Sequence, residues 1–153
     1  MRIALQRVTR GRVTVGPDTV GSIGPGLVAL VGIAEGDRHE DAVRLAAKTV
    51  RLRVFPEGDR PFHRNVADLG GEVLVVSQFT LMADVRRGNR PSWSAAADPG
   101  EAEPLVEAYA RAIEGAGVHV ERGRFGAHMS VALENDGPVT VLLDSDAIGP
   151  GGG

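Results

Sequence analysis

The sequence predicts a β-rich α/β domain of α+β-like character, with two main helices packed on one sheet. Three observations predict this class. Short apolar segments rich in valine and leucine recur, two longer segments have helical periodicity with start signals, and 21 glycines and 9 prolines separate them. A chain of 153 residues, 42% hydrophobic and 24% charged, can bury one core. We therefore expect a compact single domain.

Strands are expected at the start of the chain. Residues 2–8 alternate between apolar and polar side chains, and residues 13–15 offer a second strand, with Gly11 in the turn between them. Residues 18–26 are rich in glycine and predict turns. Residues 27–33 are apolar enough for a buried central strand.

A helix and a loop follow. Asp37, with Glu40 three residues later, resembles a capping box that opens a helix ending near residue 51. Residues 52–55 are expected to form a short strand. Residues 56–69 contain proline, glycine, aspartate and asparagine without a regular period, which predicts a surface loop.

The chain is organised around a strand that ends in polar residues. The apolar run 73–76 indicates a strand buried on both faces. It is followed by Ser77, Gln78 and Thr80 around the aromatic Phe79. A rigid strand that delivers hydroxyls, an amide and turning main-chain N–H groups at its end suits a functional site. A polar strand end with no chemical role fits the local sequence too.

An irregular basic segment, residues 82–94, comes next. Arg86, Arg87 and Arg90 lie within five residues and close to Trp93, the only tryptophan. Arginines beside an aromatic ring suit phosphate binding or base stacking. A solvated loop anchored by its tryptophan fits the same sequence, so both interpretations stay open.

The second helix has clear start signals. Asp98 stands at the N-cap, Pro99 at the first helical position and Glu101 three residues after the cap. Apolar residues recur at helical spacing over residues 102–113, and the glycines after residue 114 end the helix.

The last expected strands are residues 129–133 and 139–143. An Asp-Gly pair between them predicts a hairpin. Pro138 follows Gly137, and an X-Pro bond is the only kind that is readily cis, so its isomer stays open. The glycine-rich residues 146–153 are expected to form a flexible tail.

Charge and composition exclude several classes of protein. A net charge of −3 argues against a nonspecific nucleic-acid binder, so any nucleic-acid contact must be local. The absence of cysteine removes disulfides, thiolate nucleophiles and zinc-thiolate sites. No apolar run is long enough to span a bilayer and no signal peptide is recognisable. We expect a cytoplasmic protein that does not contact membranes.

No catalytic triad is recognisable. A serine or threonine nucleophile needs a base that is oriented by a third group. The four histidines are His39, His63, His119 and His128. None belongs to a nucleophile motif, and none has metal-ligand spacing. Ser77 and Thr80 are therefore a candidate hydrolytic site without a convincing base.

Six ordered motifs resemble the D-aminoacyl-tRNA deacylase family. They are MR with LQRV in residues 1–8, GSIGPGL at 21–27, GGE at 70–72 with SQFTL at 77–81, RPS at 90–92, GRFGAHM at 123–129 and NDGPVT at 135–140. The resemblance covers residues 1–145 and leaves only the tail from Asp146 outside it. Gly11, where alanine is usual, and residues 61–65 depart from the family pattern, away from the signature motifs.

The resemblance implies a homodimer that hydrolyses the ester joining a D-amino acid to the 3′ end of tRNA, without metal or cofactor. Ser77, Gln78, Phe79 and Thr80 would be its catalytic residues. Main-chain N–H groups around Phe79 and Thr80 would stabilise the oxyanion, and the terminal ribose 2′-OH of the tRNA would assist attack. A covalent role for Thr80 is the alternative mechanism.

The resemblance also implies how chirality is judged. Gly137-Pro138 would be a cis dipeptide that enters the partner subunit's pocket, holds the α-ammonium and crowds the face where an L side chain projects. Phe125 and Met129 would border the pocket, and Arg7 would support the Gly-Pro segment. Glycine has no side chain to exclude, so glycine wrongly attached to alanine tRNA is expected to be a substrate.

Two other functions remain to be distinguished. A non-catalytic RNA-binding module would use Arg86, Arg87 and Arg90 and cleave no ester. A hydrolase of small D-amino acid esters would act without RNA.

Overall fold

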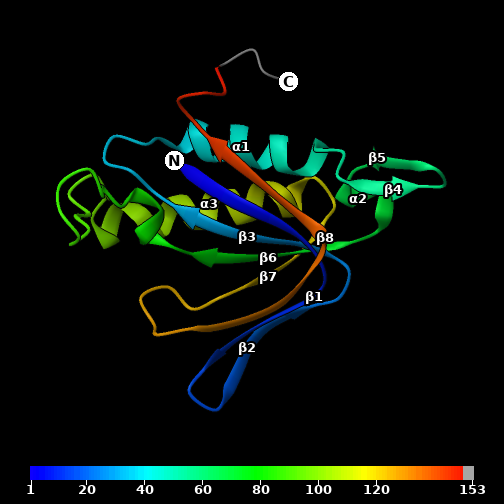
Figure 1. The fold of residues 1–153 in the computed structure, drawn as a ribbon, viewed down its shortest axis with the longest axis horizontal. Helices are drawn as coiled ribbons and strands as arrows, with labels where there is room; N and C mark the ends of the chain where they lie inside the picture. The colour runs from blue at the N-terminus through cyan, green and yellow to red at the C-terminus, as the bar shows by residue number, and fades with distance from the viewer. Residues whose placement is uncertain (150–153) are drawn as a thin grey trace.

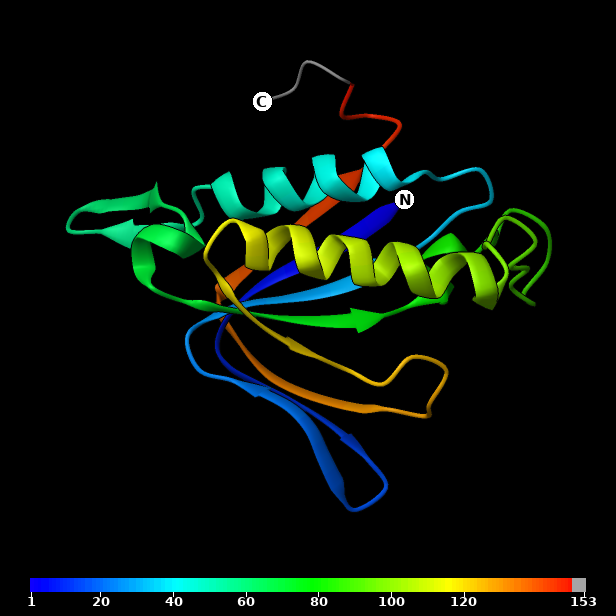
Figure 2. The same cartoon turned by 180° about the vertical axis from the view of Figure 1, so that it is seen from behind.

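The computed structural model of the chain describes residues 1–149. Its elements in chain order are β1 (Arg2–Val15), β2 (Asp18–Ile23), β3 (Gly26–Gly32), α1 (His39–Arg51), β4 (Phe55–Glu57), β5 (Arg60–Arg64), α2 (Val66–Leu69), β6 (Glu72–Ser77), the 3-10 helix η1 (Phe79–Met82), α3 (Pro99–Gly115), β7 (His119–Arg122) and β8 (Ser130–Asp144). Figures 1 and 2 show α1 and α3 side by side across one face of the sheet.

The main sheet has the strand order β2-β1-β3-β6-β7, and β8 pairs with β1 outside this path. Strands β3, β6 and β7 are parallel, whereas β1 is antiparallel to β2, β3 and β8. The long β1 bends, so its second half turns away from the helices together with β2 and the first half of β8 (Figure 1). This architecture confirms the predicted β-rich domain with two main helices on a sheet.

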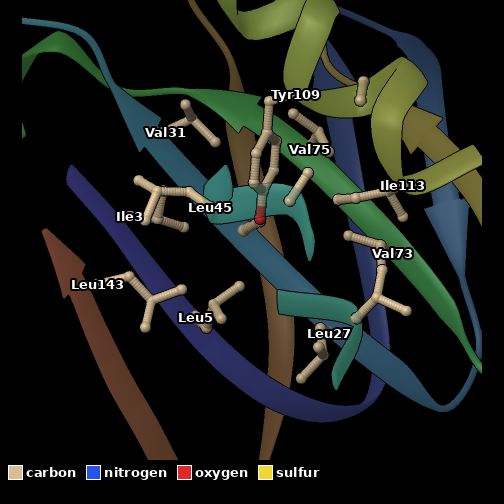
Figure 3. Close-up of a cluster of buried hydrophobic side chains, with 14 of the residues drawn as sticks. Ile3, Leu5, Leu27, Val31, Leu45, Val73, Val75, Tyr109, Ile113 and Leu143 are labelled. Atoms are coloured by element: carbon tan, nitrogen blue, oxygen red, sulfur yellow. The ribbon is translucent and has the colours of Figure 1, made fainter. Parts of the chain in front are cut away.

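The larger core lies between the helices and the sheet. Leu45 of α1 and Tyr109 of α3 are fully buried against Leu27 of β3 and Val73 of β6 (Figure 3). The Tyr109 hydroxyl lies 2.8 Å from Thr49 Oγ1, which joins the two helices inside the core. Burial raises the pKa of Tyr109 far above its ordinary value, so this hydroxyl stays neutral.

The expected turn at Gly11 is wrong. Gly11 lies inside β1, and residues 18–23, predicted as turns, form β2. A Cβ at Gly11 would lie 2.8 Å from Val28 Cγ2, so the missing side chain lets the bent strand pass close to β3. The glycine therefore marks a close approach and not a chain reversal.

Helix α1 does not begin with the expected capping box. Its N-cap is Arg38, and the Asp41 carboxylate accepts a hydrogen bond from the Arg38 main-chain N–H at 2.9 Å. Asp37 accepts from the Ala34 N–H at 2.6 Å instead. The predicted partner, Glu40, is thus one residue out of register with the cap.

The region predicted as the loop 56–69 is regular. Strand β4 begins at Phe55 and pairs with β5 in a hairpin outside the main sheet, with Gly58 at positive φ in its turn. Asn65 then caps α2 by accepting from the Asp68 N–H at 2.8 Å. Gly58 lies in the turn of this hairpin and Gly70 ends α2, whereas Pro56 and Pro61 lie inside β4 and β5. These elements are too short to show a regular period in the sequence.

The predicted hairpin at the Asp-Gly pair is also wrong. Strand β8 is continuous, and both of its halves pair with β1, which is long enough to accommodate them. Opposite Arg7 the register shifts, and residues 136–139 form what we name the β8 bulge. Asn135 closes it, accepting from the Val139 N–H and donating to Thr140 Oγ1, both at 3.0 Å.

The chain after β8 continues along the domain. The Ile148 N–H donates to the Asp144 carbonyl at 3.1 Å, and the Ile148 side chain packs against the core. Of the expected tail 146–153, residues 150–153 lie outside the described part of the chain. None of the described helices combines the length and the apolar character needed to cross a membrane.

Candidate active site

The tip of β6 (residues 77–80) is delivered by a buried strand. Residues 73–76 are buried, and the chain then turns into η1 at Phe79. The Gln78 N–H donates to the Val31 carbonyl at 2.7 Å, which fixes the turn against β3. A Cβ at Gly32 would lie 2.9 Å from the Gln78 carbonyl oxygen, so the neighbouring strand leaves just enough room for it.

A largely apolar cleft of about 580 Å³ opens beside this tip. Its volume is typical of small-molecule sites. It is lined by Val31, Ile33, Val76, Ser77, Gln78, Phe79, Trp93, Ala96, Ala97, Asp98, Pro99, Ala102, Val106, Phe125, Gly126, Ala127, His128, Met129 and Val131. Of the site residues expected from sequence, the structure thus brings together Ser77, Gln78, Phe79, Phe125 and Met129.

Thr80 lies at the tip but does not line the cleft. Its exposed side chain accepts a hydrogen bond from Gln78 Nε2 at 2.5 Å. Within residues 1–149, no imidazole or carboxylate is hydrogen-bonded to Thr80 or to Ser77. A triad is therefore not formed by these residues.

The main chain supplies the polar groups of the tip. The N–H groups of Phe79 and Thr80 are the first amides of η1, which have no carbonyl partner within the helix. Neither donates to another main-chain carbonyl in the part of the chain that the structure describes. Two such amides at the mouth of an apolar cleft can stabilise a developing oxyanion.

Two exposed aromatic rings form one wall of the cleft. The rings of Phe79 and Trp93 meet edge to face, with centroids 5.8 Å apart and an interplanar angle of 67°. They remain 58% and 40% exposed, although large aromatic residues are usually buried. Trp93 thus faces the cleft and does not anchor the loop in the core.

The loop between β7 and β8 forms the opposite wall. The Gly123 N–H donates to the Val75 carbonyl at 2.9 Å, and the Arg124 N–H contacts Met129 Sδ at 3.3 Å. These contacts hold Phe125 and Met129 beside the β6 tip. A Cβ at Gly123 would lie 2.7 Å from Met129 Sδ, so glycine is needed where the loop folds back.

Arg122 fastens this loop to α3. Its guanidinium pairs with Glu107 at 3.0 Å and with Glu114 at 2.8 Å. The hydrogen bonds from Arg122 hold the pKa of both carboxyl groups below their ordinary value, and those with Glu114 and Glu107 raise the pKa of Arg122 itself. All three groups are therefore charged at neutral pH.

The β8 bulge lies away from the cleft of its own chain. Gly137 and Pro138, joined by a cis peptide bond, are exposed and absent from the cleft lining. Arg7 lies beside the bulge and stands opposite Leu27 in the strand register of β1 and β3. Leu27 in turn stands opposite Val73 of β6, four residues before Ser77. At about 3.3 Å per residue, the bulge is more than about 10 Å from the tip along the sheet.

Arg7 anchors the β8 bulge. This guanidinium is almost fully buried, and it donates to the Asp136 carbonyl at 3.1 Å and to the Val54 carbonyl at 2.6 Å. It also pairs with the Asp136 carboxylate at 3.2 Å. A Cβ at Gly137, whose φ is +123°, would lie 2.9 Å from Arg7 Nη2.

Several cleft residues escaped sequence reasoning. Ala96, Ala97, Ala102 and Val106 come from the start of α3 and the segment before it, and Ile33 directly follows β3. Small apolar residues at these positions look like ordinary core, so no local signal marks them. Among the described residues, no group of three or more histidine or acidic side chains is placed to bind a metal ion.

Comparison with known proteins gives a consistent result. The sequence pattern of the family described as D-Tyr-tRNA(Tyr) deacylase matches residues 4–144. A D-aminoacyl-tRNA deacylase of Roseiflexus sp. (strain RS-1) is 56% identical over 145 residues, 95% of this chain and 94% of the relative. One of Thermus aquaticus is 51% identical over 145 residues, 95% of each chain.

Solved structures share the fold. A c-Myc DNA Unwinding Element Binding Protein has a TM-score of 0.88 and 36% identity, covering 94% of this chain and 98% of its own. A probable eukaryotic D-amino acid tRNA deacylase has a TM-score of 0.81 with 16% identity, covering 93% and 97%. The second similarity concerns the fold alone.

Proposed function

The chain belongs to the D-Tyr-tRNA(Tyr) deacylase family and is a D-aminoacyl-tRNA deacylase, and from this premise we propose how its cleft works. The cleft beside the β6 tip receives the 3′-terminal aminoacyl ester of the tRNA. Water then releases the free D-amino acid and the tRNA. The observation that carries this proposal is a pair of amides, of Phe79 and Thr80, that have no hydrogen-bond partner among the described residues and lie at the tip beside an apolar cleft.

The reaction follows from these groups. As water adds to the ester carbonyl, negative charge develops on its oxygen, and the Phe79 and Thr80 amides donate to it. Ser77 and Gln78 line the cleft at the same end and position the ester. No base in the described chain contacts the hydroxyl of Ser77 or of Thr80, so Thr80 forms no covalent intermediate. The tRNA's own 2′-OH assists the attack of water instead.

A second subunit completes the site. The edge of β8 that faces away from β1 has no partner strand among the described residues, and Leu142 on this strand is 77% exposed. An unpaired edge with an exposed leucine is suited to self-association. In a two-fold dimer, the β8 bulge of each subunit enters the cleft of its partner, which it does not reach in its own chain.

Rejection of L-amino acids is the task of the inserted bulge. The Gly137 and Pro138 carbonyls hold the substrate's α-ammonium, and their main chain occupies the space of an L side chain. Arg7 keeps this segment in place, and Phe125 and Met129 border the pocket. Glycine mischarged on alanine tRNA has no side chain to exclude, so it is hydrolysed as well.

The catalytic unit comprises residues 1–145, and residues 146–153 lie outside it. Because aminoacyl-tRNA is used in translation, we assign the enzyme to the cytoplasm. Binding, orientation and main-chain polarity account for the reaction, so we assign no cofactor to it.

Purified protein tests the proposal directly. D-tyrosyl-tRNA should be deacylated at least about a hundredfold faster than L-tyrosyl-tRNA without added cofactor, because the bulge sterically excludes the L side chain. A D-tyrosyl-tRNA ending in 2′-deoxyadenosine should react much more slowly. Equal rates for both enantiomers would contradict chiral rejection, and full activity on the 2′-deoxy substrate would contradict RNA assistance.

A dimer test separates the subunits. A mixture of Gly137→Ala and Phe79→Ala chains, each impaired alone, should form some heterodimers in which one cleft has both an intact tip and an intact incoming bulge. Chirally selective activity should therefore reappear on mixing and subunit exchange. A monomeric protein by sedimentation, or no recovery on mixing, would contradict donation of the bulge between subunits.

A further inference from the structure

The arginines of the segment 84–94, which we name the arginine loop, have no role in the reaction described above. We propose that Arg87 and Arg90 of this loop bind phosphates of the RNA strand that leads into the cleft. The inference rests on the proposed function, because it takes the 3′ end of aminoacyl-tRNA as the occupant of the cleft.

The arginine loop has a defined shape. Asp84 and Ser92 exchange main-chain hydrogen bonds of 2.7 and 3.0 Å, which close the loop at its base. The Asp84 carboxylate accepts from the Arg86 N–H at 3.0 Å and from Arg86 Nε and Nη2 at 2.9 and 2.8 Å. These hydrogen bonds lower the pKa of Asp84 to about 2, so it is ionised at neutral pH and balances the charge of Arg86.

The other two arginines of the loop are available to a ligand. Arg87 and Arg90 are exposed, and within residues 1–149 neither makes an ion pair or a side-chain hydrogen bond. Gly88 turns the chain between them at a φ of +68°. The structure thus divides three arginines that look alike in sequence into one that holds the loop and two that carry unbalanced charge.

A hollow, whose lining includes Arg87 but not Arg90, lies beside the arginine loop. It has a volume of about 460 Å³ and is lined by Asp84, Arg86, Arg87, Ser92 and Ser94. Guanidinium groups and serine hydroxyls are common donors to phosphate oxygens of nucleic acids. Because the protein carries a net charge of −3, attraction of an RNA strand requires such a local concentration of positive charge.

The hollow adjoins the cleft at Trp93. Ser92 and Ser94 line the hollow, and Trp93 between them lines the cleft, where its ring meets Phe79. A strand whose terminal nucleoside occupies the cleft would cross these exposed rings, which can stack with bases. Its preceding phosphates would then lie over the arginine loop, at the end of the sheet where β6 terminates (Figure 2).

The test compares a substrate that has phosphates with one that has none. The quantity measured is kcat/KM for D-tyrosyl-tRNA divided by kcat/KM for D-tyrosyl-adenosine. The double variant Arg87→Ala, Arg90→Ala should lower this ratio at least tenfold at low salt. It should also reduce the steepness of the plot of log kcat/KM for the tRNA against log salt concentration by about 1.4, because each single-strand phosphate contact contributes about 0.7 to this slope.

Two further variants identify the cause. The double variant Arg87→Lys, Arg90→Lys keeps both charges and should recover most of the ratio. Arg12→Ala removes an exposed arginine on the outer part of β1 that has no side-chain partner in the described chain, and it should match the wild-type ratio. The single variants Arg87→Ala and Arg90→Ala each remove one charge, as Arg12→Ala does, so their ratios can be compared with that of Arg12→Ala directly.

The outcomes separate this inference from the proposed function. An unchanged ratio in the double alanine variant, or an equal fall with Arg12→Ala, would overturn the arginine loop as a phosphate site. Loss of activity on both substrates in equal proportion would also overturn it. A wild-type protein that cleaves neither substrate would instead contradict the proposed function.

Discussion

The β6 tip and the β8 bulge carry the two most specific motifs of the chain, but they are held in different ways. At the tip, the Gln78 main chain is fixed to Val31, while the Thr80 side chain is exposed and, among the described residues, is hydrogen-bonded only to Gln78. In the bulge, the buried guanidinium of Arg7 donates hydrogen bonds to the main-chain carbonyls of Asp136 and Val54. Asn135 closes the segment by accepting from the Val139 N–H.

The difference fits the two roles that we propose for these regions. A group that stabilises an oxyanion through the main chain needs an open approach and two free amides. A segment that rejects an enantiomer by shape must not yield when the wrong side chain presses on it. We therefore expect substitutions of the residues that hold the bulge to have large effects, and loss of the Thr80 side chain, which does not line the cleft, to have a small one.

Arg7→Ala should have the largest effect. It leaves the Val54 and Asp136 carbonyls without their buried donor, at a cost of about 2–4 kcal/mol in the free energy of unfolding. The loosened bulge should also lower the preference for D- over L-tyrosyl-tRNA at least tenfold. Urea unfolding and paired deacylation assays measure both quantities.

Arg10→Ala is the matched control, since Arg10 lies on the same strand but is exposed, and its ion pair among the described residues is with the exposed Glu134. It should change stability by less than about 1 kcal/mol. Unaltered enantiomer preference in Arg7→Ala would contradict the supporting role of Arg7.

Gly137→Ala should rank second. A φ of +123° is unfavourable for alanine, and its Cβ would meet Arg7 Nη2 and Val139 Cγ2 at 2.9 Å. The strain should cost about 1–3 kcal/mol and shift the bulge. Gly16→Ala, at a φ of +56° with no neighbouring atom, tests backbone strain alone and should leave chiral preference intact.

Thr80→Ala should have a smaller effect. The main-chain amides stay in place and only a side-chain hydrogen bond to Gln78 is lost, so kcat should fall less than about fivefold. Single-turnover assays on D-tyrosyl-tRNA measure it. Complete inactivity of a variant with a wild-type circular dichroism spectrum would favour the covalent mechanism.

Glu114→Gln should have the smallest effect, because Glu114 contacts only Arg122, which supports the cleft wall formed by the loop between β7 and β8. The pKa of Glu114 is lowered in the folded protein by its hydrogen bond to Arg122, so its contribution to stability is present above the unfolded pKa of about 4.3 and is lost as the pH falls. Half-exposed pairs are worth less than about 1 kcal/mol. The melting temperatures of variant and wild type should therefore differ slightly at pH 7 and converge below about pH 4.

Local patterns predicted the parts of the fold that depend on nearby residues. The run 73–76 predicted β6, and Asp98 with Pro99 predicted the start of α3. Predictions of chain reversals were less accurate. Gly11 and the Asp-Gly pair are typical of turns, but both lie within strands because β1 is paired along its whole length.

Only those parts of the cleft that nearby residues mark could be predicted from the sequence. Ser77 to Phe79 follow a recognisable strand, and Phe125 and Met129 lie in a motif of the family. The wall from Ala96 to Val106 has no such mark, because its residues become a binding surface only where α3 meets the β6 tip.

The sequence by itself determined the class of the domain, its principal helices, the strand with a polar end and the family to which the chain belongs. These properties follow from periodicity and from ordered motifs, which depend on residues that are close together in the sequence. Only the tertiary structure decided that Arg7 lies beside Gly137 and that the bulge lies away from the cleft of its own chain. It also decided that, among the described residues, Arg86 is paired with a carboxylate while Arg87 and Arg90 are not. Most of these relations join residues distant in the chain, and even between neighbouring arginines the choice of partner depends on side-chain geometry that residue types do not specify.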